Sequence, residues 1–157
     1  MVKSGIGYDV HRLEKGESLI LGGVNISSSI GVIAYSDGDV LLHAIVDALL
    51  GAAALGDLGK YFPSSDEKWK EKDSVFFLQY AAELLYKKGY KIEHLDSTII
   101  LESPKVSNKI SDMIDNISNA INLDKSSISI KSTTTDGLGF IGKNEGIGAL
   151  AIATISK

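Results

Sequence analysis

Cysteine is absent from this chain of 157 residues. The chain therefore cannot form disulfide bonds or hold a metal ion through thiolates. A tight transition-metal site would need imidazole and carboxylate ligands instead. Histidine is scarce as well, because the sequence has only His11, His43 and His94. Each of these three histidines is therefore a candidate ligand that the rest of the sequence must account for.

Long apolar runs and charge of one sign are also missing. No run approaches the roughly 18 apolar residues that a membrane-spanning helix needs. Acidic and basic side chains are mixed, with a net charge of −4, so the sequence predicts no nucleic-acid partner and no membrane partner. The first patterned segment begins a few residues after Met1. We therefore expect no targeting peptide and a cytoplasmic location in a bacterium, or a plastid-type organelle if the chain is a trimmed form.

What the chain does contain is typical of a globular protein. Hydrophobic residues make up 44% of the sequence and charged residues 23%. A chain of this length can bury a core without disulfide bonds and fits one domain, which we expect to span residues 1–157.

The most informative segment, residues 36–63, opens with polar residues and then becomes almost wholly apolar. Four polar side chains recur in it at steps of three or four residues: Ser36, Asp39, His43 and Asp47. This spacing predicts a buried helix with one polar stripe. We expect Ser36 to cap the helix in a capping box with Asp39, and Asp47 to hydrogen-bond the ring of His43. Buried polar groups need partners, so another part of the chain must face the stripe.

Hydrophobic periodicity and turn residues predict the remaining elements. Their order is strand, hairpin, helix, helix, strand, helix, strand, strand, which indicates a single α/β domain with helices over one face of a sheet. A charged segment containing glycine, proline and serine, residues 56–74, should be a mobile surface loop. The predicted strands are residues 2–10, 95–101, 127–135 and 146–156, the hairpin is 18–26 with its turn at Gly22-Gly23, and the helices are 36–50, 73–88 and 106–121.

The uncovered face of the predicted sheet needs an explanation. We expect it to carry Ile128, Ile130 and the apolar run 147–155, which is too apolar for exposure to water. Self-association in a closed cyclic oligomer would cover it, with a number of subunits that the pattern leaves open.

Asp9 and His11 should point to the same face at the end of the first strand. Together with His43 they would give three nitrogen and oxygen ligands with a fourth position open, the arrangement of a catalytic zinc site. An Asp-x-His pair is also common in purely structural roles, and a helical histidine with an aspartate four residues later can be an ordinary core pair. The residues alone leave both interpretations open.

A second group of polar residues lies between Lys131 and Lys143, where three threonines and Asp136 precede three glycines. Hydroxyls, backbone N–H groups and a carboxylate are the parts of a phosphate site with Mg²⁺ or Mn²⁺. The same pattern is also that of a strand followed by a flexible hairpin loop. Lys105, at a predicted helix start, is either a weak anion site or an ordinary solvated lysine.

Taken together, these segments closely resemble the 2-C-methyl-D-erythritol 2,4-cyclodiphosphate synthase family of the non-mevalonate isoprenoid pathway. The resemblance spans nearly the whole chain in order, and its first two segments are highly specific to the family. The matching segments are GIGYDVHRL, SDGDVLLHAIVDALLGAAALGDLGKYFP, TIILESPK and STTTDGLGFIGKNEGI.

The resemblance implies a homotrimer of single-domain α/β subunits, each with a mixed β-sheet that faces the three-fold axis and helices on its other face. Active sites would lie at subunit boundaries. It also implies the metal-dependent cyclisation of 4-diphosphocytidyl-2-C-methyl-D-erythritol 2-phosphate to 2-C-methyl-D-erythritol 2,4-cyclodiphosphate with release of CMP. Positioning and charge neutralisation would be the main contributions of such a protein.

Roles carry over to matching positions of this sequence. Asp9, His11 and His43 resemble the family's zinc ligands, with one Zn²⁺ per subunit. Asp136 resembles the ligand of a second ion, Mg²⁺ or Mn²⁺, that arrives with the substrate. The family's catalytic positions match Tyr35, Thr134 and Asp136. Substrate-binding positions match Asp9, His11, Tyr35, Ser36, Asp57, Gly59, Phe62, Ser64, Asp66, Leu101, Pro104, Lys105, Thr133, Thr134, Thr135, Asp136, Phe140 and Lys143.

Four positions depart from the family pattern. Tyr35 replaces histidine, Asp136 replaces glutamate and so has a shorter reach, and Lys143 replaces arginine and so loses the bidentate fork. Ser64 stands where many relatives carry aspartate. None of these departures touches the three zinc ligands.

Many relatives also have an axial channel that can hold an isoprenoid diphosphate, and Tyr8, Phe140 and Lys143 match its lining. Two other functions remain alternatives to the cyclisation. One is a zinc-dependent phosphohydrolase with a metal-bound water as nucleophile. The other is a non-catalytic, trimeric nucleotide-binding regulator in which the histidines are structural.

Overall fold

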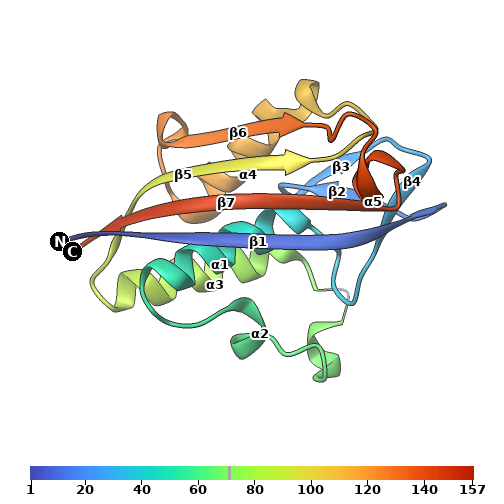
Figure 1. The fold of residues 1–157 in the computed structure, drawn as a ribbon. Helices are drawn as coiled ribbons and strands as arrows, with labels where there is room; N and C mark the ends of the chain where they lie inside the picture. Colours follow the sequence, from blue (N-terminus) through green and yellow to red (C-terminus); the bar gives the residue numbers. More distant parts are fainter. Residues whose placement is uncertain (71) are drawn as a thin grey trace.

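A computed structural model of the chain describes residues 1–70 and 72–157. Its main sheet has five strands in the order β4-β1-β7-β5-β6 (Figure 1). Only β5 and β6 run parallel, so the sheet is mixed. The strands are β1 (Val2–Lys15), β4 (Ile30–Ile33), β5 (Lys91–Ile100), β6 (Ile128–Thr133) and β7 (Gly146–Ser156).

Three long helices pack on one side of this sheet (Figure 1). They are α1 (Val40–Ala52), α3 (Ser74–Lys87) and α4 (Ile110–Ile121). The predicted α/β class, with helices on one face, is therefore confirmed. In the described part of the chain, no helix is long and apolar enough to cross a membrane. Short helical pieces are α2 (Leu58–Tyr61), α5 (Gly139–Gly142) and the 3₁₀ turns Glu67–Trp69, Ser107–Lys109 and Lys125–Ser127.

The central helix lies directly against the backbone of β1. A Cβ atom built on Gly7 would lie 1.8 Å from the carbonyl oxygen of Ala44, and one on Gly5 would lie 2.2 Å from the carbonyl oxygen of Ala48. Only glycine allows two backbones to approach this closely. These glycines therefore fix the distance between β1 and α1.

The predicted hairpin is present as β2 (Leu19–Leu21) and β3 (Val24–Ile26), which form a separate two-stranded sheet. Its turn residues Gly22 and Gly23 have φ angles of 58° and 72°. Two successive positive φ angles belong to the turn type that suits tight hairpins, which explains the Gly-Gly pair.

The cap of α1 confirms the predicted role of Asp39 at the helix start but not that of Ser36. Asp39, and not Ser36, is the N-cap residue, and its carboxylate accepts a hydrogen bond from the backbone N–H of Leu42 at 3.0 Å. The same carboxylate accepts hydrogen bonds from Gly22 N at 3.0 Å and Gly23 N at 2.7 Å. One buried aspartate thus joins the helix start to the hairpin turn. The contact was not predicted, because the residues that form it are 16 and 17 positions apart in the sequence.

The segment predicted as a loop, residues 56–74, contains α2 and a 3₁₀ turn in its described part, and residue 71 lies outside the described residues. Its mobility stays a prediction. Asp57 caps α2 and Asp66 caps the 3₁₀ turn through their side chains. These short pieces carry no hydrophobic period that a sequence pattern could reveal. The four-residue strand β4 was missed for the same reason.

The outward face of the sheet also differs from the prediction. Ile128, Ile130 and alternate residues of β7 are buried under the helices rather than directed outward. Successive residues of a strand point to opposite faces, so alternation in the sequence does not say which of the two faces the helices cover. The exposed apolar side chains of the sheet are instead Val2, Ile6 and Tyr8 on β1, Ile33 on β4, and Leu150 and Ile152 on β7.

Candidate active site

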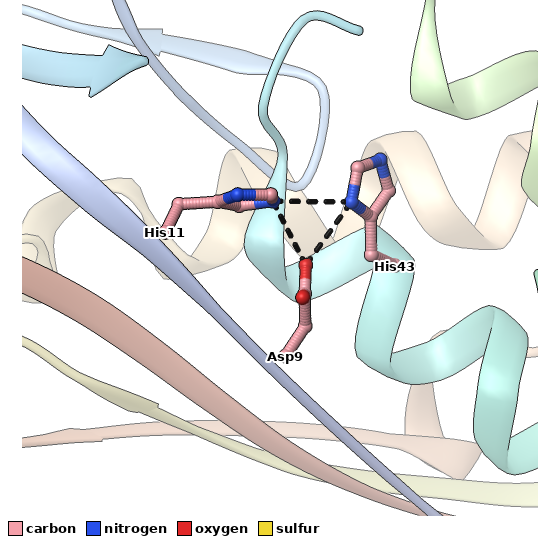
Figure 2. Close-up of side chains that lie close together, drawn as sticks. All are labelled: Asp9, His11 and His43. Carbon is pink, nitrogen blue, oxygen red and sulfur yellow. Dashed lines mark hydrogen bonds and ion pairs between the residues drawn. The ribbon is translucent and has the colours of Figure 1, made fainter. Parts of the chain in front are cut away.

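Asp9, His11 and His43 converge between β1 and the start of α1 (Figure 2). Asp9 Oδ2 lies 2.9 Å from His11 Nε2 and 3.1 Å from His43 Nδ1, and the two nitrogens are 3.3 Å apart. Asp9 and His11 are two residues apart on one face of β1, the face on which Gly7 lets α1 approach. The close packing of helix and strand thus brings the three side chains together.

The electrostatics of this cluster follow from its mixed charges. Burial alone would raise the pKa of Asp9, but hydrogen bonds with His11 and His43 outweigh it and lower the pKa to about 2. Burial would lower the pKa of His43, yet its hydrogen bond with Asp9 and the nearby carboxylates raise it. An ionised Asp9 at neutral pH is what a cation at this place requires.

The three ligand atoms have the spacing of one face of a tetrahedral metal site. Bonds of about 2.0–2.1 Å to zinc place neighbouring ligand atoms about 3.3 Å apart. The observed separations of 2.9, 3.1 and 3.3 Å are close to that value. Two imidazoles and one carboxylate are also a donor set that zinc accepts, with a fourth position left open. The residues therefore fit a bound divalent metal ion.

The other nitrogen of His43 has partners that the sequence did not predict. His43 Nε2 lies 2.8 Å from Ser74 Oγ, at the start of α3, and 3.3 Å from Ser36 Oγ. Ser74 in turn donates to Asp37 through its hydroxyl and, at 2.8 Å, through its backbone N–H. The sequence offered no signal for this contact, because Ser74 lies on another element, 31 residues from His43. The N-cap residue of α3 is Asp73.

Asp47 does not contact the ring of His43, contrary to the prediction. Its Oδ1 accepts a hydrogen bond from the backbone N–H of Leu58 at 2.7 Å. Asp47 therefore holds the first residue of α2 against α1. Burial raises the pKa of this carboxyl group. A step of four residues in a helix places two side chains on one face, but here they point to different neighbours.

A cavity of about 210 Å³ opens beside the three ligands. Four residues that matched substrate-binding positions, Tyr35, Ser36, Phe62 and Ser64, line it together with the triad. Its apolar wall includes Phe62, which packs on Phe77 with ring centroids 4.5 Å apart. Ala34, Leu58 and Trp69 complete the lining.

A separate cavity of about 300 Å³ lies at the carboxyl ends of β5 and β6, and shares no lining residue with the first. It gathers Leu101, Pro104, Lys105, Thr133 and Thr134 from the predicted substrate-binding residues. Glu102, Val106, Ser107 and Ser132 complete this second lining.

The loop after β6 presents backbone N–H groups to an anion. The carboxylate of Glu102 lies 3.3 Å from Thr135 N and 3.5 Å from Gly137 N, from which it accepts weak hydrogen bonds. Asp136 between them has a φ of 55°, in the left-handed region. Both N–H groups thus bond one carboxylate of the chain itself. The phosphate site and the role of Asp136 stay predictions.

The remaining predicted residues line neither of these two cavities. Gly59 lies within α2, directly after Leu58. Phe140 lines a third cavity of about 580 Å³ with Arg12 and Glu145, and Lys143 follows α5 as its C-cap. Tyr8 pairs with Leu150 across β1 and β7 on the exposed face. Isoprenoid diphosphate binding there stays a prediction.

Comparison with known proteins gives a consistent result. Residues 2–156 match the YgbB family. A 2-C-methyl-D-erythritol 2,4-cyclodiphosphate synthase of Alkaliphilus oremlandii (strain OhILAs) is 53% identical over 99% of this chain and 99% of its own length. The bifunctional IspDF of Campylobacter jejuni is similar in structure, with a TM-score of 0.95 and 38% identity, over 99% of this chain and 42% of that chain. A CDP complex of IspF from Plasmodium falciparum has a TM-score of 0.87 and 39% identity, over 98% of this chain and 95% of that one.

Proposed function

The chain belongs to the YgbB family, and we propose that it converts 4-diphosphocytidyl-2-C-methyl-D-erythritol 2-phosphate to 2-C-methyl-D-erythritol 2,4-cyclodiphosphate and CMP. The observation that carries this proposal is the triangle of Asp9, His11 and His43 beside a cavity. Relatives that are 53% and 50% identical to this chain are named as this synthase. The reaction makes the chain a lyase of isoprenoid precursor biosynthesis.

The chemistry is an internal phosphoryl transfer. An oxygen of the 2-phosphate attacks the β-phosphorus, a P–O bond forms, and the bond from that phosphorus to the oxygen of CMP breaks. The leaving group departs as CMP, so the atoms of the substrate are divided between two products without added water. Catalysis then depends on holding two anionic groups together and balancing their charge.

We propose that Asp9, His11 and His43 hold one zinc ion. Such an ion would supply positive charge near the diphosphate and would make its β-phosphorus more electrophilic. With one carboxylate and two neutral imidazoles as ligands it would keep about one net positive charge, which would suit a phosphate oxygen. The cavity walls from Phe62 and Tyr35 limit the space in which the substrate can fold.

A second ion, Mg²⁺ or Mn²⁺, is proposed for Asp136. Its carboxylate is a hard oxygen donor, and its backbone N–H donates to Thr134 Oγ1 at 3.2 Å. Thr133, Thr134 and Thr135 would hydrogen-bond the phosphates beside it. Lys105 would add positive charge at the wall of the second cavity.

A homotrimer with its sheets toward the three-fold axis accounts for two features of the single chain. The predicted metal-binding and nucleotide-binding residues lie in different cavities, so a neighbouring copy can complete each site. The exposed Ile6, Tyr8 and Ile152 would be covered by the same assembly. The CDP complex of the Plasmodium falciparum relative supports a cytidine nucleotide as a ligand of this chain, and we propose the second cavity as its place because that cavity gathers Leu101, Pro104 and Lys105.

The first test replaces a ligand. His43→Ala should bind zinc far more weakly and lose CMP release by at least 100-fold, because a two-ligand site cannot hold the ion, while the oligomer remains intact. Zinc content by atomic emission, CMP release and sedimentation measure the three properties. Full CMP release by this variant would contradict the proposal.

Phosphorus NMR of the products of the unaltered protein separates the two enzymatic alternatives. The proposal requires the signals of a cyclic diphosphate and of CMP. Linear phosphate products would instead indicate a zinc-dependent phosphohydrolase. Absence of any turnover, together with absence of bound zinc, would indicate a nucleotide-binding regulator.

A further inference from the structure

His43 is held from behind by a chain of hydrogen bonds that leads away from the metal-binding triangle. Its Nδ1 faces Asp9 at 3.1 Å, and its Nε2 lies 2.8 Å from Ser74 Oγ. Ser74 has no exposed surface and His43 is only 8% exposed. Water therefore has little access to the Nε2 side of the ring, and the proton on that side is set by protein groups.

The direction of these hydrogen bonds follows from the chemistry of Asp37. An ionised carboxylate can only accept hydrogen bonds. Asp37 Oδ1 is the partner of the Ser74 hydroxyl, so the single proton of that hydroxyl is directed to Asp37. Asp37 Oδ2 accepts the backbone N–H of Ser74 at 2.8 Å, which keeps the carboxylate in place. The oxygen of Ser74 then has only lone pairs to offer to His43.

An accepting oxygen at Ser74 requires a proton on His43 Nε2. The neutral imidazole carries one proton, so Nδ1 is left with a free lone pair directed at Asp9 and His11. That lone pair is what a metal ion at the triangle needs. Ser36 Oγ, at 3.3 Å from Nε2, is a more distant second acceptor.

We propose that Asp37 and Ser74 are positioning residues that fix the ring orientation and the tautomer of His43 for metal binding. The inference rests on the proposed function only in treating the triangle as a metal site. Partners behind a ligating histidine commonly change metal affinity by about 10- to 100-fold when they are removed. Asp37 and Ser74 also tie the start of α3 to the metal ligand.

Two variants separate this role from simple support of the fold. Ser74→Ala removes the acceptor and leaves Nε2–H with only the distant Ser36. Asp37→Asn keeps one acceptor for the backbone N–H of Ser74 but turns an NH₂ group toward the hydroxyl. The hydroxyl then donates to His43 Nε2, which forces the proton to Nδ1 and blocks the metal-binding lone pair. Asp37→Asn should therefore weaken metal binding at least as much as Ser74→Ala, although it removes no side-chain atoms from the core.

The experiment measures zinc affinity by competition with a chromophoric chelator, on the full chain. We expect a loss of about 10- to 100-fold for Ser74→Ala and an equal or larger loss for Asp37→Asn. The matched control is Ser97→Ala, which removes another buried hydroxyl, one that hydrogen-bonds Ser129 O on the sheet, and should stay within twofold of the unaltered protein. Circular dichroism checks that each variant is folded.

A second measurement reports on the proton itself. In zinc-loaded protein with ¹⁵N-labelled histidine, the Nε2–H of His43 should exchange slowly with water, and Ser74→Ala should make that exchange much faster. The presence of only three histidines keeps the spectrum simple. If Ser74→Ala does not fold, the zinc affinity of Asp37→Asn alone tests the proposed role of these two residues.

Affinities within threefold of the unaltered protein for both variants would overturn the inference, and so would an equal loss in Ser97→Ala. Distinctly weaker binding by Ser74→Ala than by Asp37→Asn would also overturn the proposed direction of the hydrogen bonds. CMP release by the unaltered protein is measured in parallel. Zinc binding that depends on Ser74 without any CMP release would leave the inference standing and refute the proposed function.

Discussion

At the scale of single residues, Asp39 places a carboxyl group in the core, where its charged form is costly. It is fully buried, and its carboxylate joins the start of α1 to the turn of the β2–β3 hairpin. Burial raises the pKa of Asp39 to about 6, although three backbone N–H groups stabilise its charged form. The charged form of Asp39 therefore lowers the free energy of unfolding, and the size of this effect depends on pH.

The sign of this dependence follows from the direction of the pKa shift. The folded-state pKa of about 6 exceeds the unfolded value near 3.8, so the native state binds more protons between these values. The contribution of Asp39 is fully present below about pH 4 and is lost as pH rises through 6. A pKa shift of this size changes the free energy of unfolding by roughly 3 kcal/mol between the two pH limits.

We therefore predict that the free energy of unfolding of the unaltered protein, minus that of Asp39→Asn, falls between pH 4 and pH 7 and is constant above. Asparagine does not titrate, so the subtraction removes the contributions of all other acids. Urea unfolding of the two chelator-treated proteins at equal concentration measures the difference. Parallel stability curves across this range would show that Asp39 titrates as it does in the unfolded chain.

Prediction from sequence worked best where a residue's role is local. The pairing of Asp9 with His11 on one strand face and the positive-φ glycines of the hairpin turn depend on neighbours in sequence. The partner of His43 Nε2 did not follow, because Ser74 comes from a different element. The partner of Asp47 was missed as well, since the position of Leu58 depends on how the chain leaves α1.

At the scale of elements, the contact between β1 and α1 determines whether the metal ligands meet. Gly7 lies two residues before Asp9 on the same face, and its missing side chain leaves room for the carbonyl oxygen of Ala44, next to His43. A shift of the helix away from the strand would separate the ligands on the two elements.

Gly7→Ala should destabilise the protein by about 3 kcal/mol or more, because its Cβ would lie 1.8 Å from that carbonyl oxygen. It should also weaken zinc binding. Chemical unfolding and chelator competition measure the two effects.

Gly51→Ala, within α1, is the control. Its nearest atom is the carbonyl oxygen of Ile6 at 3.8 Å, an ordinary contact, and helix propensity favours alanine by up to about 1 kcal/mol. We expect no loss of stability or of zinc affinity in this variant. Similar losses in both glycine variants would argue against the close approach as the cause.

The elements themselves were predictable to different degrees. The long helices and the strands β1 and β7 were found because their apolar residues repeat over many positions. The strand β5 begins at Lys91, four residues before the predicted start, and α2 was missed. The inward face of β6 was assigned incorrectly, since both faces of this short strand offer too few residues to define a register.

At the scale of the whole molecule, the exposed apolar side chains of the sheet predict association. Ile152 is 49% exposed and lies on β7, next to β1 in the centre of the sheet. In the proposed trimer this face is covered by the other copies, and a buried, unpaired carboxylate there would cost several kcal/mol. We predict that Ile152→Asp sediments as a monomer and releases CMP much more slowly.

The control for added charge is Asn119→Asp, which places a carboxylate on the exposed surface of α4. This variant should sediment like the unaltered protein and keep its activity. An unchanged trimer in Ile152→Asp would place the subunit contact on a different face.

The strand order in Figure 1 has a consequence for synthesis on the ribosome. Residues 146–156 form β7, which lies between β1 and β5, so the centre of the sheet cannot form until these residues have left the exit tunnel. Asp9 on β1 and His43 on α1 are synthesised well before β7, yet β1 lacks its main partner strand until β7 appears. Nascent chains should therefore remain open to chaperones until β7 appears, and the metal-binding triangle should form only after residues 146–156 have left the tunnel.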